Sequence, residues 1–133
     1  IVQWMQGIGP RPRAETPTRA ERGAAGEALA AQYLAARGVQ TVERNFRCRG
    51  GEIDLIAVDG ETLVFIEVRV RARSDYGGAR ASIDYHKQRR ILRAAKFYLA
   101  GKPARPCRFD VVVMSNANGA GIEWVRNAFD DDA

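Results

Sequence analysis

Residues 50–71 constrain the fold of this chain more than any other segment. They read GGEIDLIAVDGETLVFIEVRVR, two runs of alternating apolar and polar residues joined by Asp59-Gly60. Such alternation indicates strands whose successive side chains point to opposite faces. Asp-Gly between two such runs favours a two-residue turn, because glycine supplies the positive φ that the turn needs. The segment therefore predicts an antiparallel hairpin.

The turn also predicts the register of the two strands. With Asp59-Gly60 as the loop, Val58 pairs with Glu61, and counting back along both strands places Glu52 opposite Glu67. Glu52 and Glu67 then share one face of the hairpin, because directly paired residues point the same way.

One face of the hairpin is predicted to be polar and the other apolar. The polar face carries Glu52, Asp54, Glu67, Arg69 and Arg71. The apolar face carries Ile53, Leu55, Ala57, Val64, Ile66, Val68 and Val70. A continuous apolar face is expected to pack into a core. The polar side chains would thus stand on a rigid support.

Two interpretations of the polar face remain open. Asp54 and Glu67 are diagonal neighbours in this register, with Cα atoms about 7 to 8 Å apart. Facing carboxylates repel each other, so the hairpin favours a bound cation, and all-oxygen ligands suit Mg²⁺ or Mn²⁺. Alternatively, Arg69 and Arg71 neutralise the carboxylates as a surface charge ladder, each pair contributing about 0 to 1 kcal/mol.

The remaining patterns predict an α/β protein. We expect a helix over 19–37 ended by Gly38, a strand over 40–46, a helix over 84–100 ended by Gly101, a buried strand over 108–114, a turn over 116–121 and a short strand over 122–125. The order is helix, three strands including the central hairpin, helix and two further strands.

Length and composition indicate one domain. The chain has 133 residues with 46% hydrophobic content, enough for a single core. We assign this domain to residues 19–129, between a flexible basic arm (1–18) and an acidic tail (130–133). The sequence shows no membrane-spanning run or signal peptide, so a cytoplasmic location is expected. Cys48 and Cys107 lack metal-site spacing and are predicted to be reduced, partly buried thiols.

The net charge of +5 and the isoelectric point near 9.7 favour a polyanionic partner. A solvated helix face would produce a similar pattern on the second helix, but a basic rim beside acidic residues suits a metal-dependent phosphodiesterase, so nucleic acid, most simply DNA, is the expected partner. The candidate contacts are Arg44, Arg47, Arg49, Arg71, Arg73, Arg89, Arg90 and Arg93.

Several blocks occur in an order that resembles a known family. They are GAAGEALAAQYLAARG, ERNFRCRGGEIDLIAVDG, VFIEVRVR, HKQRRILRAAKFYL, CRFDVVVM and IEWVRNAF. Together they resemble the YraN family of uncharacterised bacterial proteins, whose fold is similar to that of archaeal Holliday junction resolvases. The resemblance implies a restriction-endonuclease-like core of the PD-(D/E)XK superfamily with a three-strand mixed sheet around the hairpin. It also implies a Mg²⁺-dependent endonuclease acting on branched or structured DNA. Junction resolvases usually present two sites, which is compatible with a homodimer.

The resemblance implies roles for particular residues. Glu27, Asp54 and Glu67 would hold the metal, helped by the Val68 carbonyl, with Glu52 and Gln88 in support. Glu27 lies on a small, apolar helical face, whereas the simpler alternative is an exposed glutamate paired with Arg22 or Arg37. Asp110 is most simply structural, paired with Arg108 or with a helix end.

The superfamily places a lysine two residues after its glutamate, but this chain reads Glu67-Val68-Arg69. An arginine binds phosphate and stabilises negative charge but does not act as a base. Lys87 matches a lysine of the family pattern, so we expect its ammonium to reach the site. The departure at Arg69 leaves an alternative, a catalytically impaired nucleic-acid-binding protein on the same scaffold.

Overall fold

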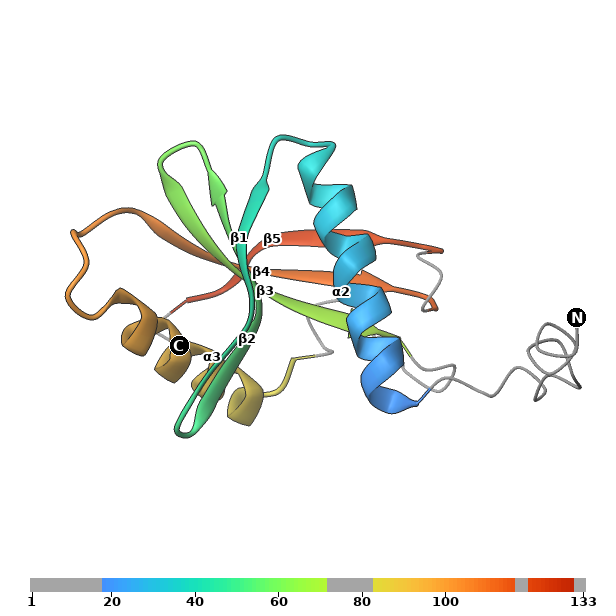
Figure 1. The fold of residues 1–133 in the computed structure, drawn as a ribbon, viewed down its shortest axis with the longest axis horizontal. Coiled ribbons are helices and arrows are strands. Elements are labelled where there is room, and N and C mark those ends of the chain that lie inside the picture. The colour runs from blue at the N-terminus through green and yellow to red at the C-terminus, as the bar shows by residue number, and fades with distance from the viewer. Residues whose placement is uncertain (1–17, 72–82, 117–119, 131–133) are drawn as a thin grey trace, which may run out of the picture.

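The computed structural model describes residues 18–71, 83–116 and 120–130 (Figure 1). Along the chain it contains α2 (Arg19–Ala35), β1 (Gln40–Cys48), β2 (Gly51–Asp59), β3 (Thr62–Val70), α3 (Tyr85–Leu99), β4 (Cys107–Met114) and β5 (Glu123–Phe129). The predicted α/β order of helix, three strands, helix and two strands is confirmed. Among the described residues, no helix combines the length and apolar character needed to cross a membrane.

The five strands form one mixed sheet in the order β1-β2-β3-β4-β5. Neighbouring strands are antiparallel except β3 and β4, which are parallel. Parallel neighbours need a crossover, and α3 lies in the connection between β3 and β4. The amino end of α3 is thereby brought to the end of the sheet at which β3 finishes.

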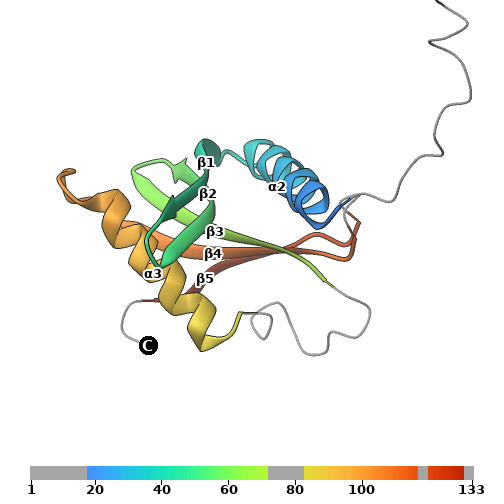
Figure 2. The same cartoon turned by 60° about the horizontal axis from the view of Figure 1, so that its bottom comes forward.

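The two helices cover opposite faces of the sheet, as Figure 2 shows. Below α2, Ala30 and Leu34 pack with Leu55, Val64 and Ile66 in one apolar cluster. Below α3, a second cluster contains Ile53, Ile56, Leu63, Phe65, Ile91, Ala94 and Ala95. Both faces of the central hairpin are therefore buried over most of its length.

The hairpin register differs from the prediction by two residues. Asp59 pairs with Thr62, so the loop is Gly60-Glu61 rather than Asp59-Gly60. Gly60 has φ +62°, and a type II′ turn places its glycine first in the loop. The predicted pairing of Glu52 with Glu67 is therefore wrong. A shift of two residues does not by itself change the face of a side chain, because strand side chains alternate with period two, so Asp54 and Glu67 still share one face.

The predicted division of the hairpin into one polar and one apolar face is only partly correct. Ile56 and Phe65 share the carboxylate face but lie beneath α3, so that face is polar at one end only. Ile53 packs in the cluster below α3, together with Ile56 and Phe65, rather than with Leu55 in the cluster below α2. Val70, expected in the core, is exposed because it stands at the end of β3.

The element boundaries differ slightly from the predicted ones. Helix α2 ends before Arg37, and Gly38 adopts φ +88°, the left-handed conformation predicted for it. The last strand continues to Phe129, well beyond the predicted end at Val125. Cys48 and Cys107 are free thiols, Cys107 being exposed rather than partly buried. The predictions for the arm before Thr18, for Arg73 and for the last residues of the acidic tail lie outside the described residues.

Candidate functional site

A hollow of about 540 Å³ lies where α2, β2, β3 and the start of α3 meet. It is lined by Arg19, Arg22, Gly23, Glu27, Asp54, Glu67, Val68, Val70, Arg71 and Lys87. Three predicted metal-binding carboxylates and the predicted lysine therefore line one hollow, although they come from four different elements.

The hollow forms at the point where the hairpin strands stop pairing. The last residue pair between β2 and β3 is Leu55 with Ile66. Beyond it, a carboxylate oxygen of Asp54 accepts a hydrogen bond from the backbone N–H of Val68 at 2.8 Å. Asp54 thus replaces a ladder hydrogen bond and is held at the mouth of the opening.

Glu67 is the most buried carboxylate of the hollow, with 4% of its surface exposed. Burial, followed by the nearby negative charge of Asp54, raises the pKa of Glu67 to about 8, while Lys87 opposes this shift. The buried Oε1 atom of Glu67 accepts no hydrogen bond from the described residues. An unsatisfied buried oxygen of this kind costs free energy unless a cation or a proton joins it.

Glu27 reaches the hollow from α2, which approaches β3 closely at Gly26. A side chain at Gly26 would meet Val70 at 3.2 Å, so the glycine permits this approach. Burial and then the charge of Asp54 raise the pKa of Glu27. The buried Oε1 of Glu27 accepts no hydrogen bond from the described residues, although Asn45 interacts with the carboxylate and Arg44 lies 4.0 Å from Oε1; both oppose the rise in pKa. Glu27 is buried, unlike the exposed glutamate of the simpler alternative.

The carboxylates of the hollow are suitable ligands for a hard divalent cation, although they do not form a complete metal site by themselves. Among the described residues, no three His, Cys, Asp or Glu side chains are already arranged around a common metal position. Mg²⁺ is usually held by one or two carboxylates, waters and substrate phosphates rather than by a complete protein shell. Glu27 and Glu67 both line this hollow, and each has a buried oxygen that accepts no hydrogen bond from the described residues, so the chemistry of the hollow is compatible with Mg²⁺ or Mn²⁺.

Lys87 enters the hollow from the first turn of α3. Asp84 caps this helix by accepting a hydrogen bond from the backbone N–H of Lys87, which fixes the position of the residue. The Lys87 Nζ atom lies 3.4 Å from Glu67 and 3.5 Å from Glu52. Glu52 does not line the hollow. It pairs with Arg90 at 3.5 Å as well as with Lys87, so it helps to hold the lysine in place.

Positive side chains surround the carboxylates. Arg71 lines the hollow and pairs with Glu123 at 3.8 Å. Arg19 and Arg22, from the first turn of α2, line it as well, and neither was predicted from the sequence to belong to the site. The start of a helix exposes N–H groups and the positive end of its dipole, which attract anions. Basic residues at that position are therefore a sequence signal for an anion-binding site.

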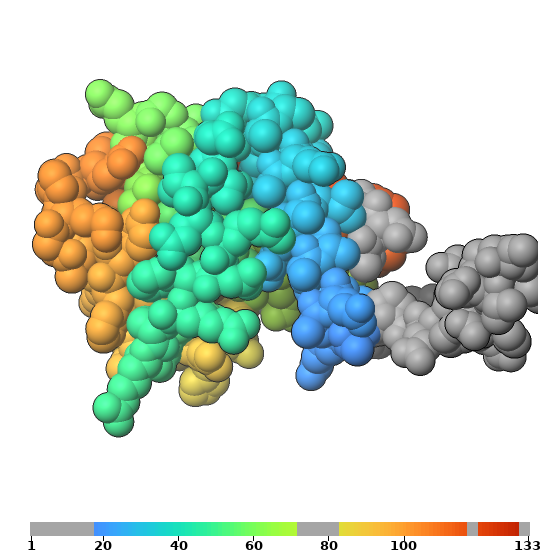
Figure 3. Space-filling model, in the orientation of Figure 1, coloured from blue at the N-terminus to red at the C-terminus, as the bar shows by residue number. Residues whose placement is uncertain are grey.

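The other predicted residues lie outside the hollow. Arg69 is half-buried, and Gln88 donates a hydrogen bond to the Ile83 carbonyl at 3.2 Å. The structure therefore does not bring Arg69 or Gln88 to the carboxylates. The exposed predicted contacts follow β1, the β1–β2 turn and α3; they are Arg44, Arg47, Arg49, Arg89, Arg90 and Arg93. Figure 3 shows the residues of β1 on this face of the molecule, between those of α2 and those of α3.

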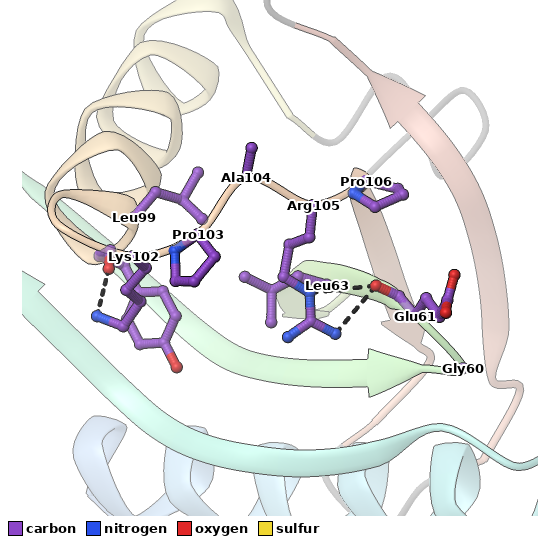
Figure 4. Close-up of a pocket in the computed structure, with 10 residues that line it drawn as sticks. Gly60, Glu61, Leu63, Leu99, Lys102, Pro103, Ala104, Arg105 and Pro106 are labelled. Atoms are coloured by element: carbon purple, nitrogen blue, oxygen red, sulfur yellow. Dashed lines mark hydrogen bonds between the residues drawn. The ribbon is translucent and has the colours of Figure 1, made fainter.

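A separate hollow of about 670 Å³ lies at the turn end of the hairpin (Figure 4). Its two cations are engaged by backbone carbonyls: Arg105 donates to Glu61, and Lys102 donates to Tyr98. None of the three candidate metal-binding carboxylates lines it. Its size alone therefore does not make it the better candidate for phosphate chemistry.

Asp110 is fully buried outside the candidate site. It accepts hydrogen bonds from Arg108 Nε, Trp124 Nε1 and the Asn127 backbone, each at 2.9 Å. Arg108 also contacts Asp59 at 3.2 Å, so this network joins β2, β4 and β5. The predicted pairing of Asp110 with Arg108 is confirmed.

The fold and the hollow define an α/β protein with a carboxylate-lined opening between two diverging strands. Residues 26–114 match the family described as "Uncharacterised protein family UPF0102", and the chain belongs to this family. The YraN resemblance is thereby supported at the family level.

Curated relatives agree with this assignment. A UPF0102 protein of Dechloromonas aromatica is 54% identical over 115 residues, covering 86% of this chain and 93% of the relative. One of Nitrosospira multiformis is 51% identical over 110 residues, covering 82% and 92%. One of Pseudomonas putida is 46% identical over 122 residues, covering 88% and 98%.

Proposed function

We propose that this protein is a Mg²⁺-dependent endonuclease of the restriction-endonuclease-like superfamily that hydrolyses phosphodiester bonds in branched or otherwise structured DNA. The observation that carries the proposal is the buried Oε1 of Glu67, which accepts no hydrogen bond from the described residues, in a hollow that Asp54 and Glu27 also line. A purely structural acid would have its oxygens satisfied, as Asp110 has.

Each side chain of the hollow has a distinct part in the proposal. Asp54 and Glu67 would hold the metal, with Glu27 as a third carboxylate that directly coordinates it or positions a ligand water. Bound there, Mg²⁺ would supply Lewis-acid stabilisation of the phosphate and a more acidic water. Lys87 would contact the phosphate undergoing hydrolysis and stabilise its developing negative charge.

The cations at the rim would hold the strand in place. Arg19, Arg22 and Arg71 line the same hollow and would contact phosphates on either side of the scissile bond. Phosphate contacts position a nucleic acid without reading its sequence. The proposed enzyme therefore selects its substrate by backbone shape rather than by base sequence.

A second candidate is a nucleic-acid-binding protein that no longer cleaves. Arg69 supports it, because this residue replaces the lysine of the Glu-x-Lys triplet and lies outside the lining of the hollow. Lys87 favours the enzyme, because its ammonium lies against Glu67 and supplies a cation from a different element.

The test is cleavage of labelled four-way, flapped and linear DNA with Mg²⁺ or Mn²⁺. We expect cleavage by the native chain and its loss in Asp54→Asn. The matched control is Asp59→Asn, the same change at the other end of β2, where the carboxylate contacts Arg108. Binding without cleavage in the native chain would support the second candidate. Absence of DNA binding even at low salt would overturn both.

A further inference from the structure

The solvent-facing side of α3 carries a feature that the proposed cleavage chemistry does not use. Arg89, Arg93, Lys96 and Phe97 line a hollow of about 240 Å³. With about 3.6 residues per turn, these four positions share one side of the helix. The buried residues of α3 occupy the opposite side; they are Ile91, Leu92, Ala94 and Ala95.

Phe97 is the informative residue of this surface. Its side chain is 56% exposed, although exposing an aromatic ring to water is unfavourable. The adjacent Tyr98 shows the usual arrangement, because its ring packs edge-on against Phe46 and Phe65. Phe97 has no ring partner among the described residues, so its flat face is available to a ligand.

The arginines beside Phe97 differ from the other cations of α3 in their ion pairs. Lys87 and Arg90, on the same helix, both pair with Glu52. Arg89 and Arg93 form no ion pair with any carboxylate in the described part of the chain. Like charges four residues apart on a helix repel each other, and an anionic ligand relieves that repulsion.

We propose that this face of α3 binds an unpaired segment of nucleic acid, with one base stacked on Phe97 and its phosphates on Arg89, Arg93 and Lys96. Cations beside an exposed aromatic ring are the usual means of binding single strands. A duplex offers phosphates to the arginines, but its bases are stacked on each other and leave the phenylalanine ring without a partner.

The surface around Phe97 lies on the same helix, α3, as Lys87 of the candidate cleavage site. Lys87 and Phe97 are ten positions apart on α3, which corresponds to about 15 Å along the helix axis. The Arg93 side chain lies against Gly50 in the β1–β2 turn, beside Arg49. The inference rests on the proposed function, since it assigns the substrate an unpaired arm that runs along α3.

The test compares the affinities of Phe97→Leu and Phe97→Trp for a labelled single strand and for a duplex of equal length. Leucine keeps apolar bulk but removes the aromatic face, whereas tryptophan retains it. We expect Phe97→Leu to weaken single-strand binding about tenfold, within the effect of losing one base–aromatic stack. Duplex binding should be unchanged, and Phe97→Trp should bind the single strand as well as the native chain.

Two further probes separate stacking from charge. A strand of abasic nucleotides keeps the phosphates but has no bases, so the native chain and Phe97→Leu should bind it equally. Arg93→Gln should weaken binding to all of these ligands and lower the salt dependence. Equal single-strand affinities of the native chain and Phe97→Leu would overturn this inference and leave cleavage by the Asp54 site standing. If the native chain binds none of these ligands at low salt, the proposed function fails as well.

Discussion

The Nζ atom of Lys87 lies 3.4 Å from Oε2 of Glu67, so a cation from the first turn of α3 contacts the most buried carboxylate of the hollow. The two residues are 20 positions apart in the sequence and meet because the connection from β3 to β4 contains α3. Glu52 contacts the same ammonium at 3.5 Å. Lys87 therefore has a defined position before any substrate binds.

Replacing Lys87 by alanine should abolish cleavage and spare the fold. Loss of one group that stabilises transition-state charge typically lowers kcat by about 10²–10³-fold. The Lys87 side chain is mostly buried and pairs with Glu67, but Glu67 can keep a proton when the ammonium is lost, so we expect a lower free energy of unfolding in a chain that still folds. Single-turnover cleavage and urea unfolding measure the two effects. The control is Lys102→Ala, whose ammonium contacts the Tyr98 carbonyl away from the hollow. Full activity in Lys87→Ala would exclude the assigned role.

The raised pKa of Glu67 predicts how stability changes with pH in the metal-free protein. The folded chain keeps the Glu67 proton up to a pKa of about 8, whereas the unfolded chain loses it near the ordinary value of 4.5. Between these values the folded state binds more protons, so the free energy of unfolding falls as pH rises. One pKa unit corresponds to about 1.4 kcal/mol, so the total decline is a few kcal/mol at most.

Urea unfolding at several pH values, in the presence of a chelator, measures this decline. Glu67→Gln should remove most of it, because glutamine does not titrate. Glu61→Gln, an exposed change at the hairpin turn, should leave the decline in place. Adding Mn²⁺ should flatten the decline in the native chain, because a bound cation favours the deprotonated carboxylate. An unchanged decline in Glu67→Gln would assign the effect to other groups.

The sequence predicted the hairpin faces better than its register. The alternation of apolar and polar residues places Asp54 and Glu67 on one face, and this placement survives a register shift of two residues. The register itself depends on which of two loop positions Gly60 occupies, and Asp-Gly is compatible with more than one turn. The pairing of Asp59 with Thr62 decides between them, because Gly60 can have a positive φ at either loop position.

Only those residues of the candidate site that follow a local sequence pattern could be predicted from the residues themselves. Asp54 and Glu67 stand on paired strands, so spacing brings them together. Lys87 was assigned through a family resemblance, and no local rule connects it with Glu67. Arg19 was missed, because its place at the hollow depends on how α2 crosses the sheet. Such contacts depend on packing at Gly26, where the helix approaches Val70.

The buried acid Asp110 should contribute to stability rather than to catalysis. Asp110→Ala would leave the partly buried Trp124 N–H and Arg108 Nε without the acceptor that the buried carboxylate supplies, and breaking a buried ion pair costs about 3–5 kcal/mol. Asp59→Ala removes another contact of Arg108, but the Asp59 side chain is more exposed than that of Asp110. The free energy of unfolding should therefore fall by about 1 kcal/mol or less. Urea unfolding compares the two variants. Cleavage per folded molecule should be unchanged in both, and a selective loss in Asp110→Ala would indicate a catalytic role.

Gly51 should be the glycine most sensitive to substitution in the hairpin. A side chain there would lie 2.5 Å from the Arg90 carbonyl oxygen of α3, and backbone atoms cannot move aside as a flexible side chain can. Gly51→Ala should therefore destabilise the fold by about 1–3 kcal/mol, the usual cost of overpacking.

The matched control for Gly51→Ala is Gly23→Ala on α2, where no atom lies within 4 Å of the added carbon. Alanine is the better helix former, so this change should stabilise the protein by roughly 0.5–1 kcal/mol. Because α3 carries Lys87, displacement of the helix by Gly51→Ala should also slow cleavage in molecules that remain folded. Urea unfolding of both variants and cleavage assays of Gly51→Ala measure these effects; Gly23 lines the hollow, so Gly23→Ala is a control for stability alone. Equal stability of the two variants would mean that α3 does not pack on Gly51 as closely as described.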